Sequence, residues 1–173
     1  DDSDHYSGVD YLAGNLEVGR IYSADIISCK SPLETAPEAY QSGGCRILFW
    51  QNKAADEDNN RSLVQIIQYA GKTTAVTADV QQESQHWLLK RLKDEGISPD
   101  FLILPHHGLL TTLDLSFPEK LSPEACVASC GELQDFRGVY ESDDFPVYKT
   151  AQAGAVQIKI TRSGKTQIET FLK

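Results

Sequence analysis

Three short stretches of the sequence hold side chains of the types that bind metal ions and activate water. The first is residues 2–5, the second is Asp79, and the third is the histidine pair at residues 106–107. Divalent cations take carboxylate oxygen and neutral imidazole together, and two ions about 3.5–4 Å apart need a carboxylate that bridges them. Such a set implies hydrolysis, because a bound cation lowers the pKa of its water and offsets charge on the attacked group.

The acidic candidates each have a structural alternative. Asp2, Asp4 and His5 are either a solvated end of the chain or part of a metal site. Asp79 directly follows a strand-like run, and by itself it would most often cap the N-terminus of the helix expected next. Capping and metal binding are compatible roles for that carboxylate.

The histidines differ in their surroundings. His106 and His107 directly follow the apolar run 101–104, which places them at the carboxyl edge of a strand, where open α/β sheets form their sites. The alternative is that both are ordinary hydrogen-bonded loop residues. His86 lies within a helix-like stretch and is expected to be a surface or half-buried helix residue.

The elements that must position these side chains alternate between strands and helices. Short β-branched and apolar runs predict strands, and apolar residues at helical spacing predict helices. Strands are expected at residues 46–50, 62–69, 73–77, 101–104, 125–129, 146–150, 155–161 and 166–172, and helices at residues 81–95, 117–121 and 133–143. This alternation, with hairpins, predicts one layered α/β domain over residues 1–173.

Composition excludes some classes of function. The 173 residues carry a net charge of −9, which argues against broad, non-specific binding to phosphate backbones. No apolar run reaches the ~18 residues that cross a bilayer, so no membrane contact is expected from this chain itself. The four cysteines are expected to be buried free thiols, with a Cys29–Cys45 bridge as the alternative in an oxidising compartment.

Four motifs in this order resemble the metallo-β-lactamase superfamily, and more closely the hydrolase domain of ComEC-type competence proteins, which take up DNA. They are Asp2-Ser-Asp-His-Tyr-Ser-Gly8, Asn59-Asn-Arg-Ser-Leu-Val64, Thr77-Ala-Asp79 and Pro105-His-His-Gly108. The family's first motif reads His-x-Asp-x-Asp-His followed by a small residue and Gly. Everything but the leading His is present here.

The resemblance implies a fold and a set of roles. The fold would be an αββα sandwich, here without its N-terminal strands. Asp4 and His5, with Asp2 beside them, would bind one ion, Asp79 would bridge, and His107 would bind the other. The cofactor would be zinc or manganese, as one or two ions.

The resemblance also implies two further site residues, and the chain departs from the family at three points. Both are predicted to be catalytic: His106 would act in proton transfer or from behind the metal ligands, and Asn60 would line the site. Ala78 stands where the family usually has Gly, the leading His is absent, and a later loop His is missing after Gly131.

The function expected from this combination is a metal-dependent hydrolase of phosphodiesters, related to DNA uptake. Its substrate would be single-stranded DNA or another phosphoester. The alternatives are a non-catalytic binding or scaffold domain and a hydrolase of small esters or lactones, since a fold does not fix a function. A ComEC-type protein would act in the cell envelope, and otherwise the chain would be cytoplasmic.

Overall fold

The computed structural model describes residues 8–23, 33–131 and 138–172. Contacts divide the chain into two compact units, residues 1–38 and residues 39–173, where the sequence predicted one domain. The described elements of the first unit are helix α2 (Val9–Asn15) and the parallel strands β1 (Tyr22–Ser23) and β2 (Glu34–Thr35). No helix in the described ranges is long and apolar enough to cross a membrane.

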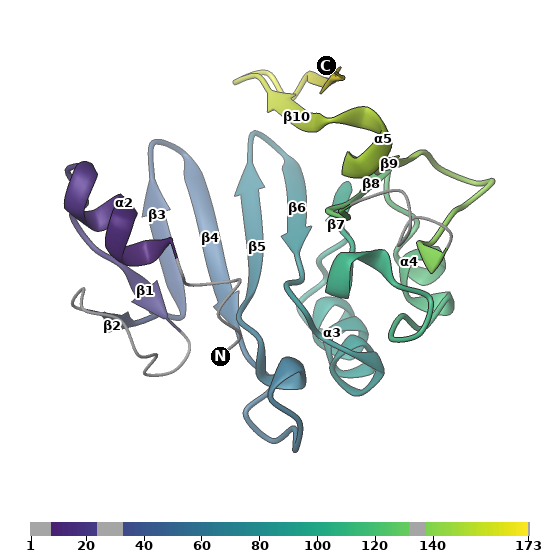
Figure 1. Cartoon of the computed structure of the whole chain (residues 1–173), viewed down its shortest axis with the longest axis horizontal. Coiled ribbons are helices and arrows are strands. Elements are labelled where there is room, and N and C mark those ends of the chain that lie inside the picture. Colours follow the sequence, from purple (N-terminus) through teal and green to yellow (C-terminus); the bar gives the residue numbers. More distant parts are fainter. Residues whose placement is uncertain (1–7, 24–32, 132–137, 173) are drawn as a thin grey trace. The chain divides into compact units, whose positions relative to one another are not determined.

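The second unit is built on a seven-stranded sheet whose strands follow one another in chain order (Figure 1). The strands are β3 (Ala39–Ser42), β4 (Cys45–Trp50), β5 (Val64–Tyr69), β6 (Lys72–Val76), β7 (Phe101–Ile103), β8 (Ala125–Ala128) and β9 (Val147–Lys149). Strands β3 to β6 pair antiparallel, and β6 to β9 pair parallel. The parallel half therefore has its carboxyl ends at one edge, the position predicted for the histidine pair.

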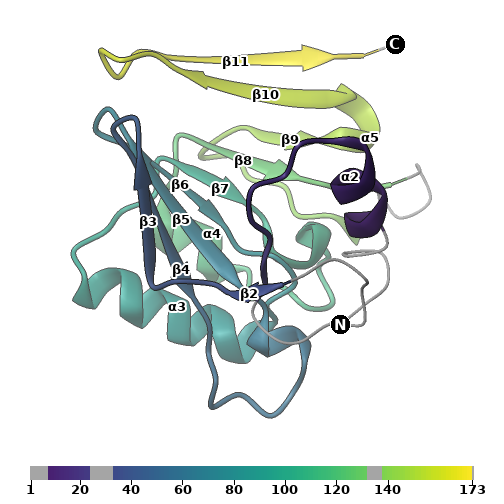
Figure 2. The same cartoon turned by 90° about the vertical axis from the view of Figure 1, so that its left-hand side faces the viewer.

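Helices and short turns connect these strands. They are η1 (Asn59–Arg61), α3 (Gln82–Asp94), η2 (Pro105–Gly108), α4 (Ser116–Leu121) and α5 (Thr150–Ala153). The chain then forms a separate antiparallel hairpin of β10 (Ala155–Ile160) and β11 (Thr166–Phe171), drawn in yellow in Figure 2. The mixed α/β class is confirmed, and the two-sheet αββα sandwich stays a prediction.

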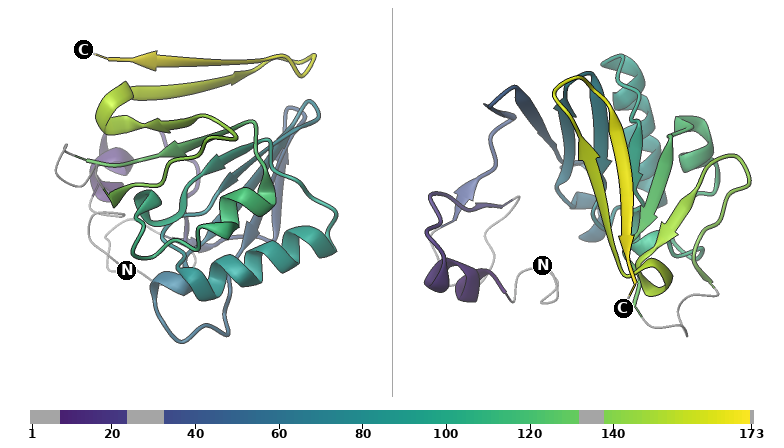
Figure 3. Two further views of the ribbon diagram at one scale, coloured as in Figure 1. Left: turned by 90° about the vertical axis from the view of Figure 1, so that its right-hand side faces the viewer. Right: turned by 90° about the horizontal axis from the view of Figure 1, so that it is seen from above.

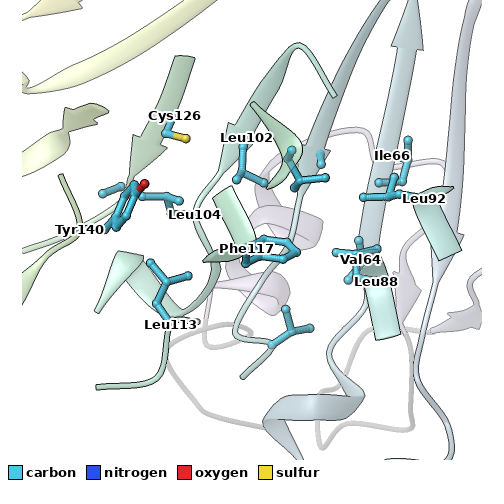
Figure 4. Packing of buried hydrophobic residues seen from close by; sticks show 14 of the residues in the cluster. Val64, Ile66, Leu88, Leu92, Leu102, Leu104, Leu113, Phe117, Cys126 and Tyr140 are labelled. Atoms are coloured by element: carbon cyan, nitrogen blue, oxygen red, sulfur yellow. The ribbon is translucent and has the colours of Figure 1, made fainter. Parts of the chain in front are cut away.

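The core lies between one face of the sheet and helices α3 and α4, which Figure 3 shows on the same side. Register places one inward residue per strand in a row across five strands, and all five are buried. The row is Leu48, Ile66, Ala75, Leu102 and Cys126. Leu88 and Leu92 from α3 and Phe117 from α4 pack into this cluster (Figure 4).

Helix α3 ends where glycine allows it. The N–H of Gly96 donates to the carbonyl of Lys93 at 3.1 Å, and the N–H of Ile97 donates to that of Leu92 at 2.9 Å. With Gly96 at a φ of 65°, this is a Schellman motif. Ile97 also packs against the core, which fixes the direction in which the chain leaves the helix.

Two expectations about elements differ from the structure. The helix predicted at 133–143 is wrong for its described part, because Val139 forms an antiparallel bridge with Leu109 instead. The carbonyls of Gly138 and Gly108 accept hydrogen bonds from the amides of Leu110 and Tyr140. Strand β3 was not predicted, because all four of its residues are exposed and show no apolar alternation.

The three described cysteines, Cys45, Cys126 and Cys130, are free thiols. Cys126 and Cys130 are buried as expected, and Cys45 on β4 is half-buried. Cys29 lies outside the described residues.

Candidate metal centre

Strands β6 and β7 bring Asp79 and the histidine pair to neighbouring segments. The two strands are parallel, with Val76 opposite Ile103, so both end at the same edge of the sheet. The hydroxyl of Thr77 donates to the carbonyl of Ile103 at 2.7 Å. One step further along, the N–H of His106 donates to the carbonyl of Ala78 at 2.9 Å. The segment that carries Asp79 is therefore hydrogen-bonded directly to the segment that carries the histidines.

His107 has its ring oriented by the next strand. Its Nδ1 lies 2.8 Å from the carbonyl oxygen of Ser129, which directly follows β8. A carbonyl only accepts hydrogen bonds, so Nδ1 must carry the hydrogen, and in a neutral ring Nε2 then keeps its lone pair. Histidines that bind metals are typically held in this way by a hydrogen bond from the other ring nitrogen.

His106 shows a different environment. Its Nδ1 is buried and has no hydrogen-bond partner among the described residues. Buried polar atoms are nearly always paired, so this ring nitrogen lacks the partner that such an atom normally has. The ring stands edge-on to that of His107, with centroids 6.0 Å apart.

The backbone that carries both rings is strained. His106, His107 and Gly108 have φ values of 46°, 62° and 76°, in the left-handed region that side chains other than glycine rarely adopt. Each such non-glycine residue costs about 1–3 kcal/mol and persists only where its surroundings impose it, commonly at functional sites. Here the surroundings are the bonds to Ala78 and Ser129 described above.

Asp79 is a buried carboxylate, only 7% exposed. The expectation that it is the N-cap of the following helix is wrong, because the N-cap position of α3 is Gln81. The residue before it, Ala78, has a φ of 48°, so a tight turn separates β6 from the carboxylate. The main structural alternative for Asp79 is thus removed.

Asn60 supplies the cap of α3 from a distance. Its side-chain oxygen accepts the N–H groups of Gln81 at 2.9 Å and Ser84 at 3.2 Å, and its side chain is 3% exposed. The hydroxyl of Ser84 donates back to the Asn60 carbonyl at 2.6 Å, and Asn52 donates to that hydroxyl at 2.9 Å. The structure therefore gives Asn60 a helix-capping role beside the site, and its catalytic role stays a prediction.

Sequence reasoning missed Gln85. This side chain is fully buried, and its amide contacts Val80, Thr112 and Asp114. The signal was present in the sequence, because Gln85 occupies the same helical stripe as Leu88 and Leu92. A polar residue in an apolar stripe requires buried hydrogen-bond partners.

A polar pocket of about 410 Å³ opens beside the Asp79 turn. It lies between η1 with the loop before it, the start of α3, and the loop after η2. Three carboxylates and five uncharged polar side chains line it: Asp56, Glu57, Glu83, Asn60, Gln81, Gln82, Thr111 and Thr112. This lining repels phosphate groups, so the pocket itself is not a binding site for a DNA backbone.

The remaining predicted ligands, Asp2, Asp4 and His5, lie outside the described residues. Within the described ranges, no three His, Cys, Asp or Glu side chains converge to hold a metal ion. His86 is an exposed residue of α3, as expected, and its Nε2 lies 2.9 Å from a carboxylate oxygen of Asp114.

Comparison with known proteins supports the relation that the motifs suggested. The structure places the chain in the broad class of α/β proteins, here with a carboxylate and two imidazoles on segments at the carboxyl edge of the sheet. No family model matches the chain. The chain is 26% identical to the competence protein ComA of Neisseria gonorrhoeae, with 94% of this chain and 25% of ComA aligned. It is thus distantly homologous to a competence protein and spans about a quarter of that relative's length. Membership of the metallo-β-lactamase superfamily stays a prediction.

Proposed function

We propose that this chain is a metal-dependent hydrolase that cleaves phosphodiester bonds. The observation that carries the proposal is the edge formed by β6, β7 and β8. There the segments of Asp79 and His106 are bonded to each other, and Ser129 fixes the His107 ring with its Nε2 lone pair available. The distant homology to ComA supports a role in the handling of DNA.

The residues at this edge fit a zinc or manganese ion. A carboxylate and a neutral imidazole are the donors that such ions accept, and the unpaired Nδ1 of His106 indicates an incomplete polar site. Asp79 and His107 would hold the cation, and the other predicted ligands, Asp2, Asp4 and His5, lie outside the described residues. When bound, one or two cations would supply Lewis-acid activation of water and of the phosphoryl oxygen.

The other residues would act around these ligands. His106 would act in proton transfer or behind the ligands, and its buried Nδ1, without a partner among the described residues, supports this role. Asn60 holds the start of α3, and the turn of Asp79 leads into that helix. The net charge of −9 leaves no large basic surface for a long duplex, so single strands and ends, whose phosphates can reach a shallow site, are the preferred DNA substrates.

The test is cleavage of labelled single- and double-stranded DNA by the full chain with manganese, with and without a chelator. We expect cleavage that depends on manganese, is faster on single strands, and is abolished by the chelator and by Asp79→Asn. His86→Gln is the matched control, because His86 is exposed and lies outside the site.

The alternatives predict other results. Hydrolysis of a simple phosphoester or a lactone without cleavage of DNA would replace the nuclease with a small-molecule hydrolase. A chain that hydrolyses nothing and binds no metal would be a scaffold domain.

A further inference from the structure

We infer that Gln85 is a positioning residue, which holds the turn of Asp79 and the loop after His107 in one arrangement. The inference rests on the proposed function, because it assigns Gln85 to the metal site proposed above. It adds a residue outside the four motifs, near the start of α3.

The side-chain amide of Gln85 uses all of its hydrogen-bonding groups on these two segments. Its Nε2 donates to the carbonyl of Val80 at 2.9 Å and to the carbonyl of Thr112 at 3.1 Å. Its Oε1 accepts the N–H of Asp114 at 2.7 Å. Val80 directly follows Asp79, while Thr112 and Asp114 belong to the loop that follows His107 and Gly108.

The chemistry of this contact requires an amide. The three partners are two carbonyls and one N–H, so the side chain must donate twice and accept once. An ionised glutamate accepts only and would face two carbonyls, and methionine offers neither group. The side chain is fully buried, so water cannot replace a lost partner.

The residues on both sides of Asp79 and Val80 are hydrogen-bonded to other segments, and Gln85 holds the Val80 carbonyl between them. Thr77 and Ala78 are bonded to the β7 side, and the N–H of Gln81 is bonded to Asn60. Loss of the Gln85 amide would let the peptide after Asp79 rotate while both ends of the turn stay in place. The expected effect is on the orientation of the carboxylate and hence on metal affinity.

The test is a calorimetric titration of the full chain with Mn²⁺, using Gln85→Met, Gln85→Glu and the wild type. Changes in residues that orient metal ligands typically weaken metal binding about 10–100-fold, and we expect both variants to lose affinity within that range. His86→Gln is the control, because this neighbour on α3 also contacts Asp114 but is exposed and does not reach Val80. Its manganese affinity should equal that of the wild type.

Thermal unfolding and circular dichroism of the metal-free proteins separate positioning from folding. Folded variants with a lower melting temperature but unchanged manganese affinity would make Gln85 purely structural and overturn the inference, while the proposed function stands. If neither variant folds at any temperature, Gln85 is also purely structural, and the inference is overturned while the proposed function stands. A wild type that binds no manganese would instead refute the proposed function, and the inference with it.

Discussion

At the scale of single residues, the candidate site depends on hydrogen bonds that orient ligands rather than on the ligands alone. His107 is oriented by the carbonyl of Ser129, and the turn of Asp79 is held by Thr77 and Ala78 on one side. Such contacts determine which lone pair faces a metal ion. Their loss should therefore affect metal binding before it affects the fold.

Loss of the Asn60 side chain should affect stability more than metal binding, because this side chain caps α3. We expect Asn60→Ala to lower the free energy of unfolding by about 1–2 kcal/mol, since the N–H groups of Gln81 and Ser84 lose their acceptor. Urea denaturation followed by circular dichroism measures this change. Asn59→Ala, at a partly exposed neighbour, is the control and should stay within ~0.5 kcal/mol of the wild type. An Asn60→Ala protein of unchanged stability that loses turnover would instead support the catalytic role.

Sequence reasoning found the candidate ligands but not what holds them. Asp79, His106 and His107 were identified because their types and their places after apolar runs are local features. The cap from Asn60 to Ser84 joins positions 24 residues apart, and no local pattern reports that contact. For the same reason Asp79 was wrongly expected to be the helix N-cap.

At the scale of elements, the loop after β7 is shaped by the close approach of its neighbours. Gly108 has a φ of 76°, and a Cβ there would lie 3.1 Å from Leu104 Cδ1 and 3.3 Å from Ala128 Cβ. The facing segment, residues 138–140, leaves no room on the third side, because Val139 Cγ1 would be 3.4 Å away. The glycine therefore lets three segments pack beside the histidine pair.

We expect Gly108→Ala to destabilise the protein by about 1–3 kcal/mol, because alanine is strained at this φ and overpacks the contact. Thermal unfolding should show a melting temperature lower by several degrees. Gly138→Ala is the matched control, since a Cβ at this position would meet no atom of the described residues within 4 Å and the φ of Gly138 is not in the left-handed region. Equal melting temperatures for both variants would show that the packing around Gly108 is looser than described.

Strand β8 is fully buried, and the reactivity of its thiol, Cys126, measures that burial. Burial raises the pKa of the Cys126 thiol to about 12, so almost no thiolate forms at pH 8. We expect iodoacetamide to leave Cys126 unmodified in the native protein and to modify it in urea, as mapped by mass spectrometry. Rapid native labelling of Cys126 would contradict the burial of β8.

The elements that sequence reasoning located are those with strong apolar patterns. Strands β4 to β8 and helix α3 were expected close to their observed bounds, because apolar runs and the helical spacing of apolar residues are local signals. The exposed strand β3 gave no such signal. The described part of the segment expected as a helix at 133–143 instead pairs its backbone with the loop after His107, a long-range contact that overrides local preference.

At the scale of the whole molecule, charge sets the limit on DNA binding. The net charge of −9 predicts weak, salt-sensitive association, and the pocket beside the site adds local repulsion from Asp56 and Glu57. We expect Asp56→Asn/Glu57→Gln to bind single-stranded DNA about threefold or more tightly at low salt, with the difference fading at high salt.

Fluorescence anisotropy with a labelled oligonucleotide measures this difference. Asp94→Asn/Glu95→Gln is the matched control, because it removes the same charge at the other end of α3. If both double variants gain the same affinity for DNA, the effect comes from overall charge, and local repulsion by the pocket carboxylates is contradicted.

The α/β class was predicted from the alternation of strand and helix patterns, and the relation to competence proteins from the order and spacing of the motifs. The division of the chain into two compact units was not predicted from the sequence. The homology to ComA covers about a quarter of that protein, so the activity of this chain has to be measured on the chain itself.

The central claim is that Asp79 and His107 hold a divalent metal ion, and metal stoichiometry tests it most directly. The full chain, Asp79→Asn, His107→Gln and the control His86→Gln are equilibrated with zinc, freed of unbound ions, and analysed by mass spectrometry of the elements. We predict at least one zinc per chain in the wild type and in the control, and a loss in both site variants while all four proteins remain folded. Stoichiometric zinc in Asp79→Asn and His107→Gln, or none in the wild type, would contradict the claim.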